Sequence, residues 1–110
     1  MCLLFIMPKK DASSPALDEH TAAHVAELFR SFSDTSRVRI LSVLIEREEN
    51  VGSLAILVGI SESAISHHLR SLRQLGLVQT RRDGKEIYYR VDDAHLIALF
   101  REGVKHVQYG

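Results

Sequence analysis

The chain has 110 residues, of which 45% are hydrophobic, and this is enough for one modest core but not for two independent ones. Its 14 basic and 14 acidic residues balance, which argues against a strongly basic protein that coats nucleic acid without selectivity. A single cysteine, Cys2, excludes a disulfide framework within the chain and a metal cluster of several cysteines, and it suits a reducing cytosol.

The first 16 residues have the composition of an arm rather than of a folded element. The opening MCLLFIM is apolar, but it is too short to span a bilayer and lacks the charged start of a secretory signal. Residues 8–16 contain two prolines, two serines and three charged residues, which is typical of a mobile segment. We therefore expect a flexible arm over residues 1–16, one domain over residues 17–110, and a cytoplasmic protein without membrane contact.

Three helices are predicted in the first half of the chain. In residues 17–32 the apolar side chains recur at the three- and four-residue spacing of an amphipathic helix: Ala22, Val25, Leu28, Phe29 and Phe32. Residues 36–47 are apolar enough to lie at the centre of the core. Residues 51–58 predict a short helix, which Gly59 and Ile60 would end in a turn.

A fourth helix is predicted over residues 62–74, with Ser61 as its N-cap. Its buried stripe is expected to consist of Ile65, Leu69 and Leu72, with Leu75 as a candidate fourth member. Because this helix follows the short helix of residues 51–58 after a glycine-containing turn, the pair has the outline of a helix-turn-helix.

The segment that follows changes from a helical to an alternating apolar pattern. Residues 77–82 and 85–91 predict two strands, and the Asp83-Gly84 pair between them is a strong signal for a β-hairpin. A last helix is predicted to start near Asp92 or Asp93. The predicted fold is therefore mainly α with a small β-hairpin, a winged helix-turn-helix.

Positive charge is concentrated in residues 61–90, which hold six basic residues against three acidic ones. On the helix of residues 62–74, short polar side chains suit base edges in a major groove and arginines suit phosphates: Ser63, Ser66, His67, Arg70 and Arg73. The hairpin tip would lay three cations on the neighbouring DNA backbone or minor groove: Arg81, Arg82 and Lys85. Solvated helix faces and hairpin tips are often polar, but the direct succession of these two elements favours binding of double-stranded DNA.

Asp93, His95 and His106 predict a metal site that two chains share. The two histidines are eleven residues apart, so they point the same way along the helix but lie about 16 Å apart. A zinc–nitrogen bond is only about 2 Å long, so the two cannot hold one ion within a straight helix. If a second copy places the same helix alongside in reverse, Asp93 and His95 of one chain meet the other chain's His106. The alternative is a histidine pair that stabilises a dimer or the helix dipole.

Three stretches in order resemble the ArsR/SmtB family of metal-responsive repressors: residues 29–41, residues 61–72 and residues 84–89. The resemblance covers roughly residues 18–109. It implies a homodimeric winged helix-turn-helix protein that represses its own operon and releases the operator DNA when a metal binds.

Family members carry their metal sites in different places. One type uses cysteines ahead of the recognition helix, but Asn50 stands there in this chain and no Cys-x-Cys occurs, so an arsenic, cadmium or lead site is not expected. The other type uses the terminal helix, where this chain keeps the aspartate and two histidines but has Tyr109 in the place of the fourth ligand. A neutral tyrosine is a poor zinc ligand.

Three outcomes follow for the fourth ligand: water completes the site, a histidine from elsewhere replaces the ligand, or the site has lapsed. His20 and His24 are candidate ligands, because they lie one helical turn apart on a first helix that the resemblance places beside the terminal one. Otherwise they are surface polar residues. Imidazole and carboxylate donors favour zinc as the inducer, with cobalt or nickel as alternatives if His20 or His24 raises the coordination number.

Other classes of function remain as alternatives. The chain could be a metal-blind winged-helix regulator with another inducer, or a winged-helix module that binds a protein partner. An enzyme or a small organic substrate is not expected, because the sequence has no His-Glu-x-x-His, glycine-rich phosphate loop or paired carboxylates. Ser66 beside His67 and His68 does not suggest a nucleophile and base, since neighbouring helical residues point about 100° apart.

Overall fold

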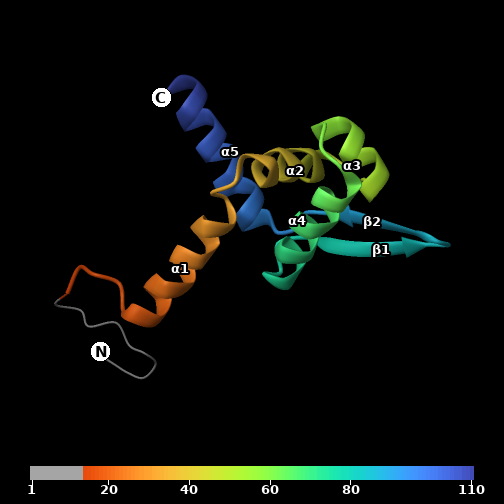
Figure 1. Ribbon diagram of the computed structural model, residues 1–110. Helices are drawn as coiled ribbons and strands as arrows, with labels where there is room; N and C mark the ends of the chain where they lie inside the picture. The colour runs from red at the N-terminus through yellow and green to blue at the C-terminus, as the bar shows by residue number, and fades with distance from the viewer. Residues whose placement is uncertain (1–13) are drawn as a thin grey trace. The chain divides into compact units, whose positions relative to one another are not determined.

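The computed structural model of the protein describes residues 14–110, and the chain divides into two compact units, residues 1–33 and residues 34–110 (Figure 1). In residues 14–33, the described part of the first unit, there is one helix, α1 (Glu19–Ser31). The second contains, in order, α2 (Thr35–Glu46), α3 (Val51–Val58), α4 (Glu62–Gln74), β1 (Gln79–Asp83), β2 (Glu86–Arg90) and α5 (Ala94–Tyr109). The predicted mainly α fold with one hairpin is confirmed; most of the predicted arm lies outside the described residues.

The α1 helix begins at a side-chain cap and carries exposed apolar residues. The carboxylate of Asp18 accepts a hydrogen bond from the backbone N–H of Thr21 at 3.0 Å, and this bond lowers the pKa of Asp18. Val25 and Phe29, both on the predicted apolar stripe, are 37% and 52% exposed. The amphipathic pattern is present, but the described chain leaves part of its apolar stripe in contact with water.

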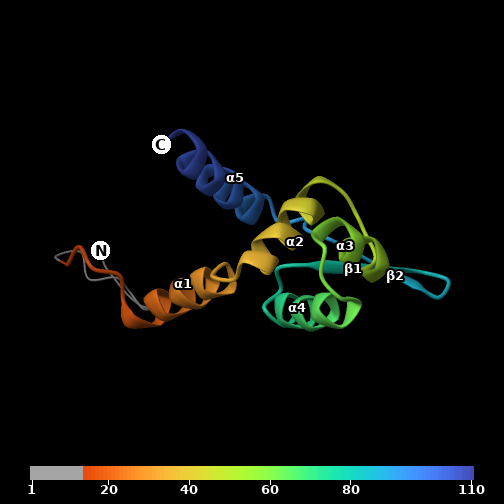
Figure 2. The same cartoon turned by 45° about the horizontal axis from the view of Figure 1, so that its top comes forward.

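The core of the second unit is built where α2, α3 and α4 meet. α2 contributes Ile40, Leu41 and Leu44, which are at most 1% exposed, and α3 contributes Leu54. From α4, the predicted residues Ile65, Leu69 and Leu72 are buried at the spacing of one helical face. In the views of Figure 1 and Figure 2 the hairpin projects away from these helices and its turn forms the far tip.

The candidate fourth member of the stripe, Leu75, is not buried, and the reason is the way α4 ends. Leu75 is the C-cap and is 38% exposed, while Gly76 adopts a left-handed φ of 74° and turns the chain. Gly76 N–H donates to Arg73 O at 2.9 Å and Leu77 N–H donates to Leu72 O at 2.9 Å, the two bonds of a Schellman motif. Leu77, only 9% exposed, is therefore buried in place of Leu75.

The hairpin is present, but its turn lies one residue later than predicted. β1 and β2 pair antiparallel, with Asp83 opposite Glu86, so Gly84 and Lys85 form the two-residue loop. Gly84 has a φ of 64°, as the first central position of a favoured hairpin turn requires, and only glycine adopts this without strain. Lys85 therefore lies at the tip of the wing rather than in a strand.

The α5 helix starts where predicted, because Asp93 is its N-cap. Oδ1 of Asp93 accepts hydrogen bonds from the N–H groups of His95 and Leu96 at 2.9 and 3.1 Å. Leu96 is the only residue of α5 that is buried, whereas Val104 and Val107 are 37% and 84% exposed. Among the described residues, no helix has the length and apolar character needed to cross a membrane.

Candidate nucleic-acid interface and metal ligands

The turn between α3 and α4 is fixed by local signals and by one contact with α2. Gly59 takes a left-handed φ of 80° as the C-cap of α3, and Ser61 Oγ accepts from Ala64 N–H at 3.0 Å to start α4. Arg39 of α2 donates to Val58 O, one of the last carbonyls of α3, at 2.6 Å. These contacts hold the two helices as a helix-turn-helix unit.

The residues of α4 that were predicted to contact DNA lie away from its buried stripe. Ser63, His67, Arg70 and Arg73 are exposed, and Ser66 is half-buried. Within residues 14–110, neither Arg70 nor Arg73 forms an ion pair, so both guanidinium groups are available to phosphates. The exposed face of α4 therefore offers short hydrogen-bonding groups near its start and cations toward its end.

His68, which sequence reasoning did not select as a site residue, ties α4 to the start of α2. Its Nδ1 lies 3.1 Å from Nε of Arg37, and its Nε2 lies 3.7 Å from Oδ2 of Asp34, the N-cap of α2. Because arginine only donates, Nδ1 must accept and the proton of the neutral ring is on Nε2. Burial lowers the pKa of His68, and Arg37 and His67 also lower it, against the opposing effect of Asp34. No sequence signal identified this contact, which joins residues 31 positions apart.

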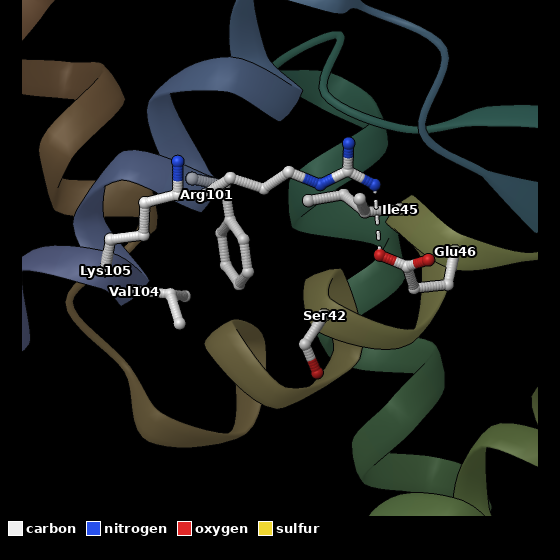
Figure 3. Close-up of a pocket in the computed structure, with 7 residues that line it drawn as sticks. Ser42, Ile45, Glu46, Arg101, Val104 and Lys105 are labelled. Carbon is white, nitrogen blue, oxygen red and sulfur yellow. Dashed lines mark hydrogen bonds and ion pairs between the residues drawn. The ribbon is translucent and has the colours of Figure 1, made fainter. Parts of the chain in front are cut away.

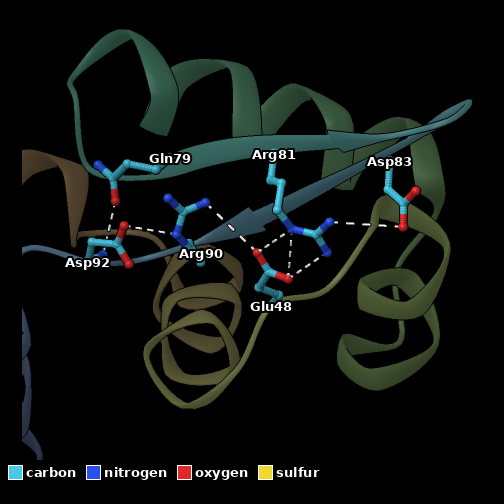
Figure 4. Close-up of polar contacts among 6 residues, drawn as sticks. All are labelled: Glu48, Gln79, Arg81, Asp83, Arg90 and Asp92. Atoms are coloured by element: carbon cyan, nitrogen blue, oxygen red, sulfur yellow. Dashed lines mark hydrogen bonds and ion pairs between the residues drawn. The ribbon is translucent and has the colours of Figure 1, made fainter.

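The three cations predicted at the wing differ in their surroundings. Arg82 and Lys85 are exposed and have no ion pair among residues 14–110. Arg81 instead holds Glu48, from the loop between α2 and α3: Nη2 lies 2.8 Å from Oε1, and Nε lies 3.1 Å from Oε2 (Figure 4). Its guanidinium carbon also lies 4.9 Å from the centre of the Tyr88 ring. Arg81 is therefore engaged within the protein.

The predicted metal ligands of α5 have atoms available to coordinate a metal, but these atoms do not come together within one chain. Asp93 uses Oδ1 as the helix cap, and no contact engages its Oδ2 among the described residues. The His95 side chain is fully exposed, with Nδ1 3.8 Å from Oδ1 of Asp93. His106 is exposed in the last turn. In residues 14–110 no group of three or more His, Cys, Asp or Glu side chains is close enough to hold a metal ion.

His20 and His24 lie side by side on α1. Their ring centres are 4.4 Å apart, and Nδ1 of His24 lies 2.9 Å from the backbone oxygen of His20. This contact leaves Nε2 of His24 as the ring nitrogen available to coordinate a metal. Both side chains are exposed. The pair offers two imidazoles on one helix face, which is fewer than the four donors that a structural zinc site requires.

A cavity of about 310 Å³ lies between α2 and α5 (Figure 3). Ile45 and Ser42 of α2 face Val104 of α5 across it. At its edge, Nη2 of Arg101 and Oε2 of Glu46 form an ion pair of 3.0 Å that links the two helices. Its lining includes no histidine, cysteine or aspartate, and its one carboxylate, Glu46, is held by Arg101, so it offers no set of metal ligands.

Comparison with known proteins places these features in a family. The sequence profile described as "Bacterial regulatory protein, arsR family" matches residues 34–80, which include α2, α3 and α4. The chain is 44% identical to the transcriptional repressor SmtB homolog of Synechocystis sp. over 87 residues, covering 79% of this chain and 66% of that protein. It is 35% identical to the cadmium resistance transcriptional regulatory protein CadC homolog of Staphylococcus aureus, covering 89% of this chain and 82% of that protein.

A solved structure with a similar fold is that of NolR from Sinorhizobium fredii. It is 32% identical to this chain and superimposes with a TM-score of 0.75 over 86% of this chain and 97% of that one. The relatives share both the sequence of the helix-turn-helix and the winged arrangement around it. The chain belongs to the arsR family of bacterial regulatory proteins.

Proposed function

We propose that the protein is a metal-responsive transcriptional repressor that binds operator DNA as a homodimer and dissociates from it when a divalent metal binds. The observation that carries this proposal is the combination of a complete winged helix-turn-helix with an α5 helix that exposes Asp93, His95 and His106. Family membership supports the DNA-binding half, since the SmtB homolog is named as a transcriptional repressor. The CadC homolog is named for cadmium resistance, which supports a link to metals.

The exposed face of α4 is the proposed reader of the major groove. Ser63, Ser66 and His67 would contact base edges, because they are short or planar and lie near the start of the helix. Arg70 and Arg73 would contact phosphates, as would Arg82 and Lys85 of the wing. In a dimer, two such helices about one turn of DNA apart would read a palindromic operator.

The exposed apolar residues of α5 support dimerisation. Leu99, Val104 and Val107 lie within about 140° of one another around the helix, and Val107 is 84% exposed in the single chain. A second copy that packs its own α5 against this stripe would remove these side chains from water. The same antiparallel contact would bring Asp93 and His95 of one chain to His106 of the other, twice in each symmetric dimer.

The donor set suits zinc better than a soft ion. Asp93 Oδ2 and the exposed His95 and His106 rings supply one carboxylate and two imidazoles, which zinc accepts in a tetrahedral site. Cadmium favours thiolates, and the chain has one cysteine. With Tyr109 in the fourth position, water would complete the tetrahedron. Cobalt or nickel as inducer would draw on His20 or His24 for additional ligands.

Metal and DNA would then oppose each other through the arrangement of the two subunits. Coordination across the α5 helices would fix a dimer in which the two α4 helices and wings no longer fit successive grooves. Such coupling is reciprocal: the factor by which metal weakens DNA binding equals the factor by which DNA weakens metal binding. In a metal-blind regulator, metal would leave the affinity for DNA unchanged.

A subunit-mixing experiment tests the shared site. His95→Ala and His106→Ala are each expected to bind cobalt weakly, measured by the ligand-field absorbance of the bound ion, and both leave the Asp93 cap in place. A hybrid dimer of the two variants has one site that lacks both histidines and one that is intact. Mixing equal amounts should therefore restore about a quarter of the wild-type sites. A mixture that binds no more cobalt than the separate variants would contradict a site shared between subunits.

A further inference from the structure

The loop of residues 47–50 contacts the wing at three successive positions. Glu48 pairs with Arg81 of β1, and its Oε2 is also 3.8 Å from Nη1 of Arg90 in β2. Glu49 exchanges two backbone hydrogen bonds with Tyr89, at 3.1 and 2.9 Å. This loop therefore borders the hairpin along β2 and reaches across to β1.

Asn50 extends the connection into the helix-turn-helix. Its Nδ2 donates to Oε1 of Glu86 in β2 at 2.9 Å, while its Oδ1 accepts from Ser53 N–H at 2.8 Å and caps α3. One side chain thus joins the wing to the first helix of the DNA-reading pair. Three adjacent residues, Glu48, Glu49 and Asn50, therefore link the wing to the helices.

The polar contacts around Glu48 form a continuous network. Nε of Arg90 binds Oδ2 of Asp92 at 2.8 Å, and the N–H of Asp92 donates to Oε1 of Gln79 at 2.9 Å (Figure 4). The hydrogen bonds from Arg81 lower the pKa of Glu48, with the positive charges of Arg81 and Arg90 acting in the same direction. Glu48 is therefore a carboxylate at neutral pH. It faces both arginines, while Asp92 also pairs with Arg90 and Oδ2 of Asp83 lies 3.9 Å from Nη1 of Arg81.

Neighbouring residues of a strand point to opposite faces of a hairpin. Arg81 is on the face that meets Glu48, so Arg82, which pairs with Ile87 across the hairpin, is directed to the other face. Lys85 lies in the two-residue turn. Arg82 and Lys85 are thus exposed without an ion pair in the described part of the chain, whereas Arg81 pairs with Glu48 and Arg90 pairs with Asp92 and, at 3.8 Å, with Glu48.

We propose that residues 48–50 are a wing anchor, in which Glu48 is a positioning residue. Arg81 and Arg90 hold the wing in place through this anchor. Arg82 and Lys85 supply the phosphate contacts of the wing. This inference rests on the proposed binding of DNA, and it removes Arg81 from the set of DNA contacts expected from sequence. An anchored wing places its two free cations at a fixed position relative to α4. A loose wing would bind phosphate anywhere within its reach, so the anchor contributes to the preference for operator over other DNA.

The test compares two neighbouring arginines by the salt dependence of DNA binding. The plot of log K against log salt concentration has a negative slope, and each phosphate contact makes it steeper by about 0.9. Arg82→Gln removes one contact from each of the two wings of the dimer, so it should make that slope less steep by about 1.8 for operator and scrambled DNA alike. Arg81→Gln should leave the slope unchanged and lower the ratio of operator to scrambled affinity by about threefold to tenfold. An equal loss of slope in the two variants would overturn the assignment of Arg81.

Glu48→Gln gives the complementary result, because it removes the closer of the two carboxylates that pair with Arg81 and thus one negative charge. We expect tighter binding to scrambled DNA, a steeper salt slope and a lower operator preference than in the wild-type chain. Unchanged binding to both DNAs would overturn the positioning role of Glu48.

A second readout needs no DNA and keeps the anchor distinct from the proposed function. In the wild-type chain the amide hydrogens of Glu49 and Tyr89 should exchange slowly with solvent, because each donates to the other residue. Glu48→Gln should speed exchange at both amides by about threefold to tenfold, with exchange in α4 unchanged. If the wild-type chain bound no DNA, the proposed function would fail, and the exchange rates alone would then test the wing anchor. Equal exchange rates in variant and wild type would overturn the anchor.

Discussion

The helix-turn-helix with its wing and the terminal helix α5 differ in how much of their structure one chain completes. Around α4, apolar side chains are buried and polar side chains form hydrogen bonds within residues 34–110. Along α5, one residue is buried, the exposed side chains include Leu99, Val104 and Val107, and the candidate metal ligands do not meet within the described chain. The DNA-reading element is a property of the single chain, whereas the proposed sensing element requires two. Metal binding between the α5 helices can then affect DNA binding by changing how the two subunits of the dimer are arranged.

The largest effect is expected from breaking the core under α4. Leu69→Ala removes a side chain that is 1% exposed and should lower the free energy of unfolding by about 3 kcal/mol, through lost burial and the cavity left behind. Urea denaturation measures it. Leu75→Ala is the matched control on the same helix: at 38% exposure it should change stability by less than about 1 kcal/mol. Equal losses would contradict the assignment of the buried stripe.

A charge on the exposed stripe of α5 should separate subunits without unfolding them. Val107→Asp places a carboxylate where the second copy is proposed to pack, and it should raise the dimer dissociation constant by about tenfold or more. Sedimentation at several concentrations measures this constant. Ile56→Asp is the control, since Ile56 is 83% exposed on α3 and outside the proposed interface. If both changes left the dimer intact, α5 would not be the dimer contact.

The wing turn offers a smaller effect with an internal contrast between two glycines. Gly84→Ala should cost about 1 kcal/mol, because its φ of 64° disfavours any residue with a Cβ. Gly103→Ala lies inside α5, where an added Cβ meets nothing within 4 Å in the single chain, and should stabilise the monomer by about 0.5 to 1 kcal/mol. Thermal unfolding of the two variants should shift in opposite directions. A shift in the same direction would contradict the turn geometry.

The smallest expected effect is a pH dependence from His68. Because its pKa in the folded chain lies below the ordinary value of 6.5, the unfolded chain takes up a proton that the folded chain does not as the pH falls below 6.5. The free energy of unfolding should therefore decrease in that range. His68→Asn keeps an acceptor for Arg37 Nε but does not titrate, so its stability should fall less between pH 7 and about pH 5. Identical pH profiles would show that His68 does not contribute.

The elements predicted correctly from sequence are those with local signals. The starts of α4 and α5 follow from Ser61 and Asp93, whose side chains cap the first turn, and the buried faces of α2 and α4 follow from apolar spacing. The hairpin was predicted one residue out of place, because Asp83-Gly84 and Gly84-Lys85 are both acceptable turns and strand pairing decides between them.

The features missed from sequence are those that join distant segments. Arg81 was expected to contact DNA as one more cation of the tip, yet it pairs with a carboxylate 33 positions earlier in the chain. Arg37 and His68 are 31 positions apart. Apolar spacing carries no information about which polar groups meet across the core. The ligand set of α5 depends on a second chain, so its geometry follows neither from one sequence nor from one folded copy.

The most direct test of the central claim is fluorescence anisotropy of operator DNA during a zinc titration, with the wild-type chain beside His106→Ala. We predict that zinc weakens operator binding by the wild type by a factor in the usual allosteric range, about 5- to 150-fold, and leaves the variant unaffected. Both proteins should bind the operator equally without metal, since His106 is exposed and distant from α4 along the chain. Tight operator binding by the wild type that is indifferent to zinc, cobalt and nickel would contradict metal sensing and leave a metal-blind repressor.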